Sequence, residues 1–188
     1  MLDQSLQGGF DNPPVQSATA FRAALSVMAR PGNIETIQGA QAPAPMSRAA
    51  ATLLLTLCDQ DTRLFLADGF DTPDIRNWVA FHIGAPIVEP DSAQFAVGRW
   101  SGLPLPLLPI GTPEYPDRSA TVIVEVEHLN QQGARLTGPG IREAANLSLP
   151  ETAAFVANRA LFPLGLDFYF TAGSSLAALP RSTRVEER

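Results

Sequence analysis

The chain has 188 residues, 45% of them hydrophobic and 17% charged, so it can form a real core and is most simply one domain over residues 1–188. Its net charge of −6 comes without a basic patch or run, which argues against a nucleic-acid-binding protein. All 13 basic side chains are arginines, which excludes an internal Schiff base with pyridoxal phosphate and a Walker-type phosphate-binding lysine. A GC-rich genome would also remove lysine, and the chemical exclusion holds for either cause.

Cysteine and histidine are scarce. Cys58 is the single cysteine and follows an apolar run, so we expect a buried structural thiol and no disulfide, iron–sulfur cluster or cysteine-based zinc site. His82 and His128 lie far apart, and His82 is expected to pack beside Trp78. The first residues lack the features of a signal peptide, and every apolar run is too short to span a bilayer. We therefore expect a cytoplasmic protein without cofactor, metal, nucleic acid or membrane as partner.

Three helices are predicted in the first half of the chain. In residues 17–30 the side chains of Phe21, Leu25, Met28 and Ala29 recur at helical spacing, and a Pro-Gly pair follows. Ser47 is the expected N-cap of a second helix, which is apolar over most of its surface and therefore buried on several sides. A third helix has Thr72 as its cap, proline at its first position and Gly84 just beyond its end.

Strands are predicted between and after these helices, with a last helix over 150–161. The strongest strand signal is 121–128, which is apolar at first and then alternates. Helices alternating with short apolar strands indicate an α/β layer fold, and adjacent strands late in the chain indicate a mixed sheet. The other expected strands are 33–37, 63–67, 86–88, 94–97, 134–137, 167–171 and 176–179.

Residues 101–118 contain five prolines among leucine and isoleucine residues. Proline is excluded from helix interiors and central strands, so we expect a long ordered loop with much apolar surface. Such loops are uncommon in compact domains and are often functional. The apolar side chains either pack beneath the loop or form a partner interface, with Leu105, Leu107 and Leu108 as the candidates for contact.

Four residues are candidates for ligand binding or for an interface: Asp117, Arg118, Arg181 and Arg184. Asp117 could orient Arg118 toward an anionic ligand, or the two could form an internal ion pair that holds the loop. Arg181 and Arg184 could form a second anion site, but an extended segment would point them to opposite faces. No nucleophile–base pair emerges from the spacing, so the catalytic residues are unknown. Gly138-Pro139-Gly140 is an incomplete dinucleotide fingerprint and is expected to form a turn, or at most a backbone nest for an anion.

Several motifs in sequence order resemble the PhnH family, the H subunit of the bacterial carbon–phosphorus lyase system. The order and positions of the motifs span nearly the whole chain, although Pro13-Pro14 departs from the family's pattern. The matching motifs are Gly9-Phe10, Phe21-Arg22, Met28-Ala29-Arg30-Pro31-Gly32, Thr112-Pro113-Glu114-Tyr115-Pro116-Asp117-Arg118-Ser119-Ala120-Thr121, Leu136-Thr137-Gly138-Pro139-Gly140-Ile141, Phe162-Pro163-Leu164-Gly165-Leu166-Asp167 and Leu179-Pro180-Arg181-Ser182-Thr183-Arg184-Val185.

This resemblance implies a three-layer α/β/α sandwich with a mixed sheet, similar to the large domain of PLP-dependent aminotransferases but lacking PLP. It also implies a homodimer that assembles with PhnG, PhnI and PhnJ. With PhnG, PhnI and PhnL, the subunit would support transfer of the ribose triphosphate of ATP to an alkylphosphonate with release of adenine. The resemblance carries over no catalytic residue. We expect an accessory subunit that is not catalytic alone. The alternatives are a subunit whose arginines bind a nucleotide or phosphonate, and an independent small-molecule enzyme.

Overall fold

The computed structural model describes residues 6–186, and a six-stranded mixed sheet lies at its centre. The strand order is β1-β8-β7-β4-β3-β2. Strands β2, β3, β4 and β7 run parallel to one another, whereas β8 is antiparallel to both of its neighbours. The strands are β1 (Glu35–Thr36), β2 (Leu64–Leu66), β3 (Phe95–Arg99), β4 (Thr121–Glu125), β7 (Asp167–Ala172) and β8 (Ser175–Leu179).

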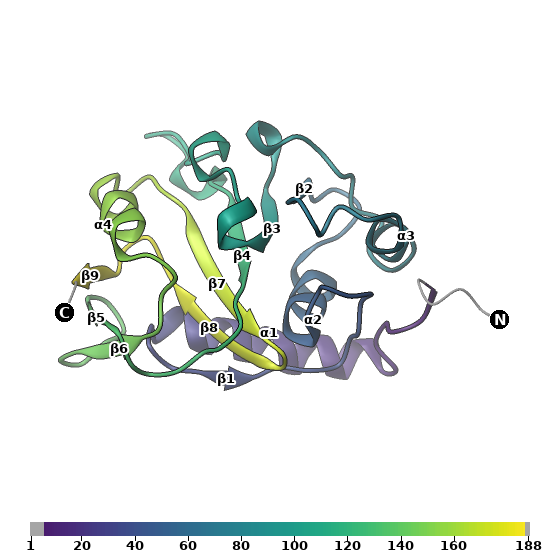
Figure 1. Ribbon diagram of the computed structural model, residues 1–188, viewed down its shortest axis with the longest axis horizontal. Helices are drawn as coiled ribbons and strands as arrows, with labels where there is room; N and C mark the ends of the chain where they lie inside the picture. The colour runs from purple at the N-terminus through teal and green to yellow at the C-terminus, as the bar shows by residue number, and fades with distance from the viewer. Residues whose placement is uncertain (1–5, 187–188) are drawn as a thin grey trace.

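Helices cover one face of the sheet, and a mixed layer covers the other (Figure 1). On the first face lie α1 (Pro13–Ala29), α2 (Arg48–Leu57) and α3 (Pro73–His82). The second face carries α4 (Thr152–Ala160), the loop between β3 and β4, and a small sheet in the order β6-β5-β9. The small sheet consists of β5 (Ala134–Thr137), β6 (Ala145–Leu147) and β9 (Arg184–Glu186). The predicted α/β class and mixed sheet are confirmed. Among residues 6–186, no helix has both the length and the hydropathy needed to cross a bilayer.

The predicted caps of the second and third helices are confirmed. The Ser47 hydroxyl accepts a hydrogen bond from the backbone N–H of Ala50 at 3.2 Å, and six consecutive residues of α2 are buried. The Thr72 hydroxyl accepts from the N–H of Ile75, and Gly84 follows α3 with φ of +76°. His82 packs beside Trp78 as expected, with ring centroids 5.1 Å apart.

Helix α1 begins four residues earlier than predicted, with Pro13 at its start, and it buries a different face from the one that its large side chains mark. Ala20, Ala24 and Val27 are its buried residues, whereas Phe21 and Leu25 are 46% and 53% exposed. Small residues on the inner face allow α1 to approach the sheet and α2 closely. The apolar spacing therefore identified the helix, although its fully buried residues are two alanines and a valine.

Two glycine-containing motifs that are far apart in the sequence meet at the end of α1. Gly140 adopts φ of +80°, and a Cβ atom placed on it would lie 1.9 Å from the carbonyl oxygen of Ala29. Any side chain at this position would collide with the backbone at the end of α1. The predicted turn at Gly138-Pro139-Gly140 is thus a point of close contact between the small sheet and α1.

Cys58 follows α2 and packs against the helical side of the core. Its thiol was expected to be buried, and the structure shows it partly buried. Burial raises the pKa of its thiol to about 12, and the adjacent carboxylate of Asp59 adds a smaller effect in the same direction. The thiolate is therefore scarce at neutral pH.

Candidate functional site

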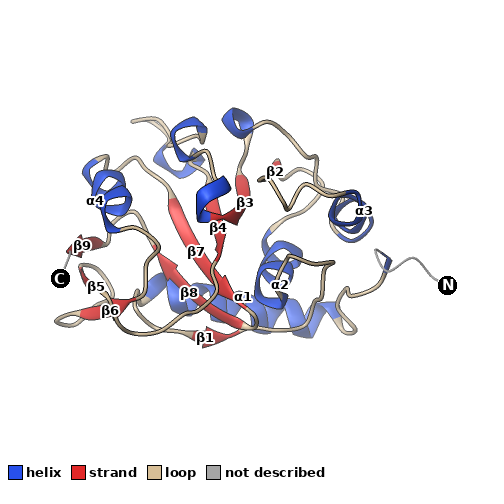
Figure 2. Cartoon of the chain, in the orientation of Figure 1, coloured by secondary structure: helices blue, strands red, loops and turns tan. Residues whose placement is uncertain are grey.

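The loop between β3 and β4 is ordered by short 3₁₀ turns at Trp100–Gly102, Leu105–Leu107 and Pro116–Arg118, which Figure 2 shows as short blue segments. Leu103 and Leu108 are buried beneath it, whereas Leu107 is 60% exposed. Part of the loop's apolar surface therefore belongs to the core, and part faces outward. Leu108 belongs to the buried part, so it is unavailable for contact with a partner.

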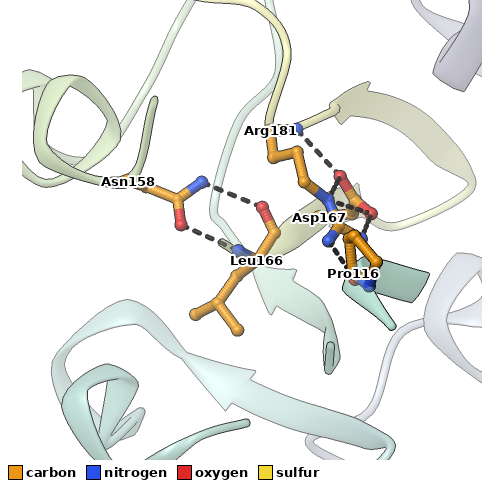
Figure 3. A network of polar contacts seen from close by, with 5 residues as sticks. All are labelled: Pro116, Asn158, Leu166, Asp167 and Arg181. Atoms are coloured by element: carbon orange, nitrogen blue, oxygen red, sulfur yellow. Dashed lines mark hydrogen bonds and ion pairs between the residues drawn. The ribbon is translucent and has the colours of Figure 1, made fainter. Parts of the chain in front are cut away.

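Arg181 fastens the end of this loop to the sheet (Figure 3). Its guanidinium binds both carboxylate oxygens of Asp167, the first residue of β7, in a fork-like ion pair. Its Nη1 also donates to the carbonyl oxygen of Pro116 at 2.6 Å, and its backbone N–H donates to Asp167 Oδ1 at 2.8 Å. Each of the three guanidinium nitrogens thus has a partner within the chain. The sequence suggested an ion pair between Asp117 and Arg118 that would hold the loop. In the structure, Arg181 and Asp167 form the ion pair that does so.

A second polar contact beside Arg181 fixes α4 to the start of β7 (Figure 3). The side-chain amide of Asn158 donates to the carbonyl oxygen of Leu166 at 2.9 Å and accepts from its N–H at 2.8 Å. One side chain therefore satisfies both backbone groups of Leu166, as a neighbouring strand would. This contact keeps α4 in place next to the loop.

The other three predicted site residues are exposed and do not gather around one point. Asp117 and Arg118 lie in the last turn of the loop, where the Arg118 guanidinium stacks over the Tyr115 ring at 3.9 Å. Within residues 6–186, Arg118 forms no ion pair. Arg184 lies on β9 opposite Thr137 with its side chain outward. The structure thus places the Pro116–Arg118 turn against Arg181 and leaves Arg184 apart. Arg181 and Arg184 do not meet at one site, which agrees with the expectation that they point to opposite faces.

An apolar groove of about 760 Å³ lies between the loop and α4. Trp100 closes one side, where its indole N–H donates to a carboxylate oxygen of Glu151 at 3.1 Å and its ring packs against Phe155. Leu107, Leu161 and Phe162 are also exposed in these two segments. The groove is lined by Trp100, Ser101, Leu103, Leu105, Pro106, Ile110, Glu151, Ala154, Ala157, Asn158, Leu161, Leu166 and Phe168.

Sequence analysis missed a polar cluster at the carboxyl ends of the parallel strands. Arg99 and Glu125 end β3 and β4, and Thr171 is the penultimate residue of β7. The three lie side by side, because the register pairs Arg99 with Glu125 and Glu125 with Thr171. Glu125 Oε2 accepts a hydrogen bond from the buried Thr171 hydroxyl at 2.9 Å, and the N–H of Ser47 donates to it at 3.4 Å. The signal in the sequence was weak: Arg99, Glu125 and Thr171 each follow a short run of apolar residues.

Glu125 titrates abnormally for its residue type. Burial raises its pKa above the ordinary value, while the hydrogen bonds from Ser47 and Thr171 and the charge of Arg99 offset part of the increase. A cleft of about 410 Å³ adjoins it, lined by Pro45, Arg99, Trp100, Ser101 and 125–127. In open sheets with parallel strands, ligands bind outside the carboxyl ends of the strands, and this is where the cleft lies. Within residues 6–186, no group of three His, Cys, Asp or Glu side chains is arranged to hold a metal ion.

The family model described as bacterial phosphonate metabolism protein (PhnH) matches residues 8–186. The chain belongs to the PhnH family. It is 38% identical, over 97% of its length and 96% of the relative, to the alpha-D-ribose 1-methylphosphonate 5-triphosphate synthase subunit PhnH of Rhizobium meliloti (strain 1021). It is 27% identical, over 89% of its length and 84% of the relative, to the putative C-P lyase subunit protein HtxG of Stutzerimonas stutzeri. The PhnH match includes the groove, the Arg181 ion pair and the Glu125 cluster.

Proposed function

We propose that the chain is a subunit of a carbon–phosphorus lyase system in organic phosphonate catabolism and contributes binding surfaces instead of a catalytic group of its own. The 38% identity to the Rhizobium meliloti subunit over 97% of the chain carries this proposal. The subunit would act with PhnG, PhnI and PhnL while the ribose triphosphate of ATP is transferred to an alkylphosphonate and adenine is released.

Genetic complementation tests this role. A strain of Rhizobium meliloti that lacks its PhnH subunit should regain growth on methylphosphonate as sole phosphorus source when it expresses this chain. Growth on inorganic phosphate serves as the control, because it does not require phosphonate cleavage. A chain that is expressed and folded but restores no growth on methylphosphonate would count against the proposed role.

The groove between the loop and α4 is the proposed contact surface for another subunit, with PhnG, PhnI and PhnJ as the candidates. Its wall is predominantly apolar, and the exposed Leu107 lies in the loop that borders it. The Arg181 ion pair and the Asn158 contact hold both borders of the groove in place, so a partner would meet a preformed surface. An apolar partner segment would gain affinity from burial of these side chains.

Substitution of the half-buried Leu105, which lines the groove, and of the exposed Leu107 in the same loop tests this surface. Leu105→Ala combined with Leu107→Ala should weaken co-purification with PhnG, PhnI and PhnJ by roughly tenfold or more, since an interface leucine contributes about 1–2 kcal/mol. Val156→Ala is the matched control, because Val156 is 47% exposed on α4 and does not line the groove. Leu108 is unsuitable for this test, because it is 3% exposed and its truncation would perturb the core. Assembly of the double variant at wild-type strength would eliminate the groove as the contact surface.

The second candidate function is binding of a nucleotide or phosphonate, and the cleft beside Glu125 is the feature that favours it. Arg99 offers an exposed guanidinium there, and Trp100 lines the same cleft. Calorimetry with ATP and with methylphosphonate on the isolated chain tests this candidate. Binding should be lost in Arg99→Ala if the cleft is the site, and in Arg118→Ala if the loop is the site. An absence of heat with both ligands, together with unchanged complex activity of both variants, rules the candidate out.

We further propose that the chain shares its backbone arrangement with the large domain of PLP-dependent aminotransferases and forms a homodimer. The mixed sheet, with three helices on one face, supports the first part. Because the chain has no lysine, a domain of this type could not hold PLP by the usual covalent link. Superposition of an experimentally determined structure on such a domain tests the likeness. Measurement of the molar mass in solution tests the homodimer.

A further inference from the structure

Helix α1 presents an apolar stripe on its outer side. Pro14, Ala18, Phe21, Leu25 and Ala29 are all exposed, and their spacing of three or four residues places them along one side of the helix. Phe21 and Leu25 are large apolar side chains, and they are 46% and 53% exposed. We refer to these five residues as the outer stripe of α1.

The rest of the exposed surface of α1 is also poor in charge. Arg22 is the one charged residue among the 17 residues of the helix. A helix on the surface of a soluble domain usually carries several charged side chains opposite its buried face, because water solvates that face. The outer stripe therefore has the composition of a covered surface.

We propose that the outer stripe of α1 is the contact between two copies of the chain, with the two α1 helices packed antiparallel. The inference rests on the homodimer named in the proposed function and assigns it a surface. The stripe is close to symmetric about Phe21, since two members precede it and two follow it at similar spacing. A twofold axis beside Phe21 would place the two Phe21 rings together and Ala18 opposite Leu25 of the second copy. Small side chains would thus face large ones.

The charges at the two ends of α1 fit this arrangement and no parallel one. Asp11 precedes the helix and Arg30 follows it, and both are exposed. In the antiparallel pair, Asp11 of each copy meets Arg30 of the other, which forms two opposite-charge pairs. A parallel pair would bring like charges together at both ends. Arg22 comes level with Phe21 of the second copy, where its guanidinium can stack on the ring.

The size of the contact sets the expected strength of the dimer. A helix of 17 residues is about 25 Å long, so one helix pair buries less surface than a standard stable interface. The dimer should therefore dissociate on dilution, with a dissociation constant on the order of micromolar. Salt should weaken it further, because the Asp11–Arg30 pairs would lie at the exposed ends of the contact.

Sedimentation velocity of the full chain over a concentration series tests the inference. The wild type should shift from monomer to dimer as concentration rises, whereas Phe21→Glu and Leu25→Glu should remain monomeric at concentrations at least tenfold higher. Thr19→Glu is the matched control, because Thr19 is exposed on the same helix and lies farther around it from Phe21 and Leu25 than Arg22 does. Circular dichroism checks that each variant is folded.

A charge exchange provides a second test that leaves the apolar residues unchanged. Asp11→Arg alone should weaken the dimer, and Asp11→Arg combined with Arg30→Asp should restore it. A wild type that stays monomeric at every concentration would refute the homodimer and this inference together. A wild-type dimer that persists in Phe21→Glu and Leu25→Glu, or that Asp11→Arg does not affect, would refute the α1 contact and leave the homodimer in place.

Discussion

Each end of the parallel strands carries a partly buried carboxylate, and the two carboxylates are stabilised in different ways. At the amino end, Asp167 is paired with Arg181 at short range, and the guanidinium has no donor nitrogen left without a partner. At the carboxyl end, the hydrogen bonds from Ser47 and Thr171 and the charge of Arg99 only partly offset the effect of burial on the pKa of Glu125. The amino end is therefore closed by an ion pair, and the carboxyl end keeps a carboxylate whose charge is only partly compensated.

The two carboxylates of the sheet therefore differ in role: Asp167 stabilises the fold, and Glu125 is available to a ligand. The Asp167–Arg181 ion pair has a partner within the chain at every guanidinium nitrogen and contributes to the position of the loop. A carboxylate with a raised pKa beside a cleft can exchange a proton or accept a hydrogen bond from a ligand. The motif that contains Arg181 thus stabilises the fold, whereas Glu125, whose pKa is raised, lies in a stretch without a recognisable motif.

Arg181→Ala should have the largest effect on stability, because it removes the ion pair at the amino end of the strands. The substitution leaves a mostly buried Asp167 carboxylate unpaired and releases the carbonyl oxygen of Pro116. We expect the free energy of unfolding to fall by about 3 kcal/mol in chemical denaturation. Arg184→Ala is the matched control, because Arg184 is exposed, and it should change the value by less than about 0.5 kcal/mol. Equal effects of the two substitutions would contradict the assignment of Arg181 to the architecture.

Thr171→Val should have the next largest effect and acts on the open end. It keeps the shape of the side chain but removes the hydroxyl that donates to Glu125, so we expect a loss of about 1–2 kcal/mol in the free energy of unfolding. The pKa of Glu125 should rise further, because a hydrogen bond that favours the charged form is lost. In a double-mutant cycle with Glu125→Gln the two changes should be non-additive, and strict additivity would mean that the contact has no energetic role.

Glu125→Gln should have a smaller effect whose sign depends on pH. The folded state binds the Glu125 proton more tightly than the unfolded chain, because burial raises the folded-state pKa above 4.5. The wild type therefore loses stability as pH rises from 4.5 through the folded-state pKa, and the glutamine variant does not share this loss. The stability of the variant relative to the wild type should increase over that window. Glu127→Gln, at an exposed position, is the control, and parallel pH profiles for the wild type and Glu125→Gln would argue against a raised pKa.

Arg118→Ala should have the smallest effect on stability. Its guanidinium stacks on the exposed Tyr115 ring and forms no ion pair within residues 6–186, so its removal should cost less than about 1 kcal/mol. The same denaturation series measures this value. A loss comparable with that of Arg181→Ala would mean that Arg118 also belongs to the closed end.

Local signals predicted the elements whose boundaries are encoded within a few residues. Thr72, Pro73 and Gly84 mark the ends of α3, and the structure agrees with each of them. Ser47 caps α2 for the same reason, because a cap requires only the next turn of helix. Strand 121–128 was predicted too long, since β4 ends at Glu125, where its last partner on β7 is Thr171.

Features that depend on distant partners could not be read from the sequence. Ala20, Ala24 and Val27 form the buried face of α1 because the sheet and α2 lie close to it, whereas periodicity alone favoured Phe21 and Leu25. Strands β6 and β9 are three residues long and partly polar, so only their pairing with β5 reveals them. The Glu125 cluster depends on register between three strands, and the Arg181 ion pair joins the ends of two strands.

Cys58 provides a natural chemical probe of the region at the end of α2. As the single thiol in the chain, with a pKa raised to about 12, it reacts slowly with alkylating reagents in the folded state and faster whenever α2 opens and exposes it to water. The rate of its modification therefore reports changes in the exposure of this thiol at the end of α2. The unmodified sequence thus allows this region to be followed in an assembled complex without an introduced label.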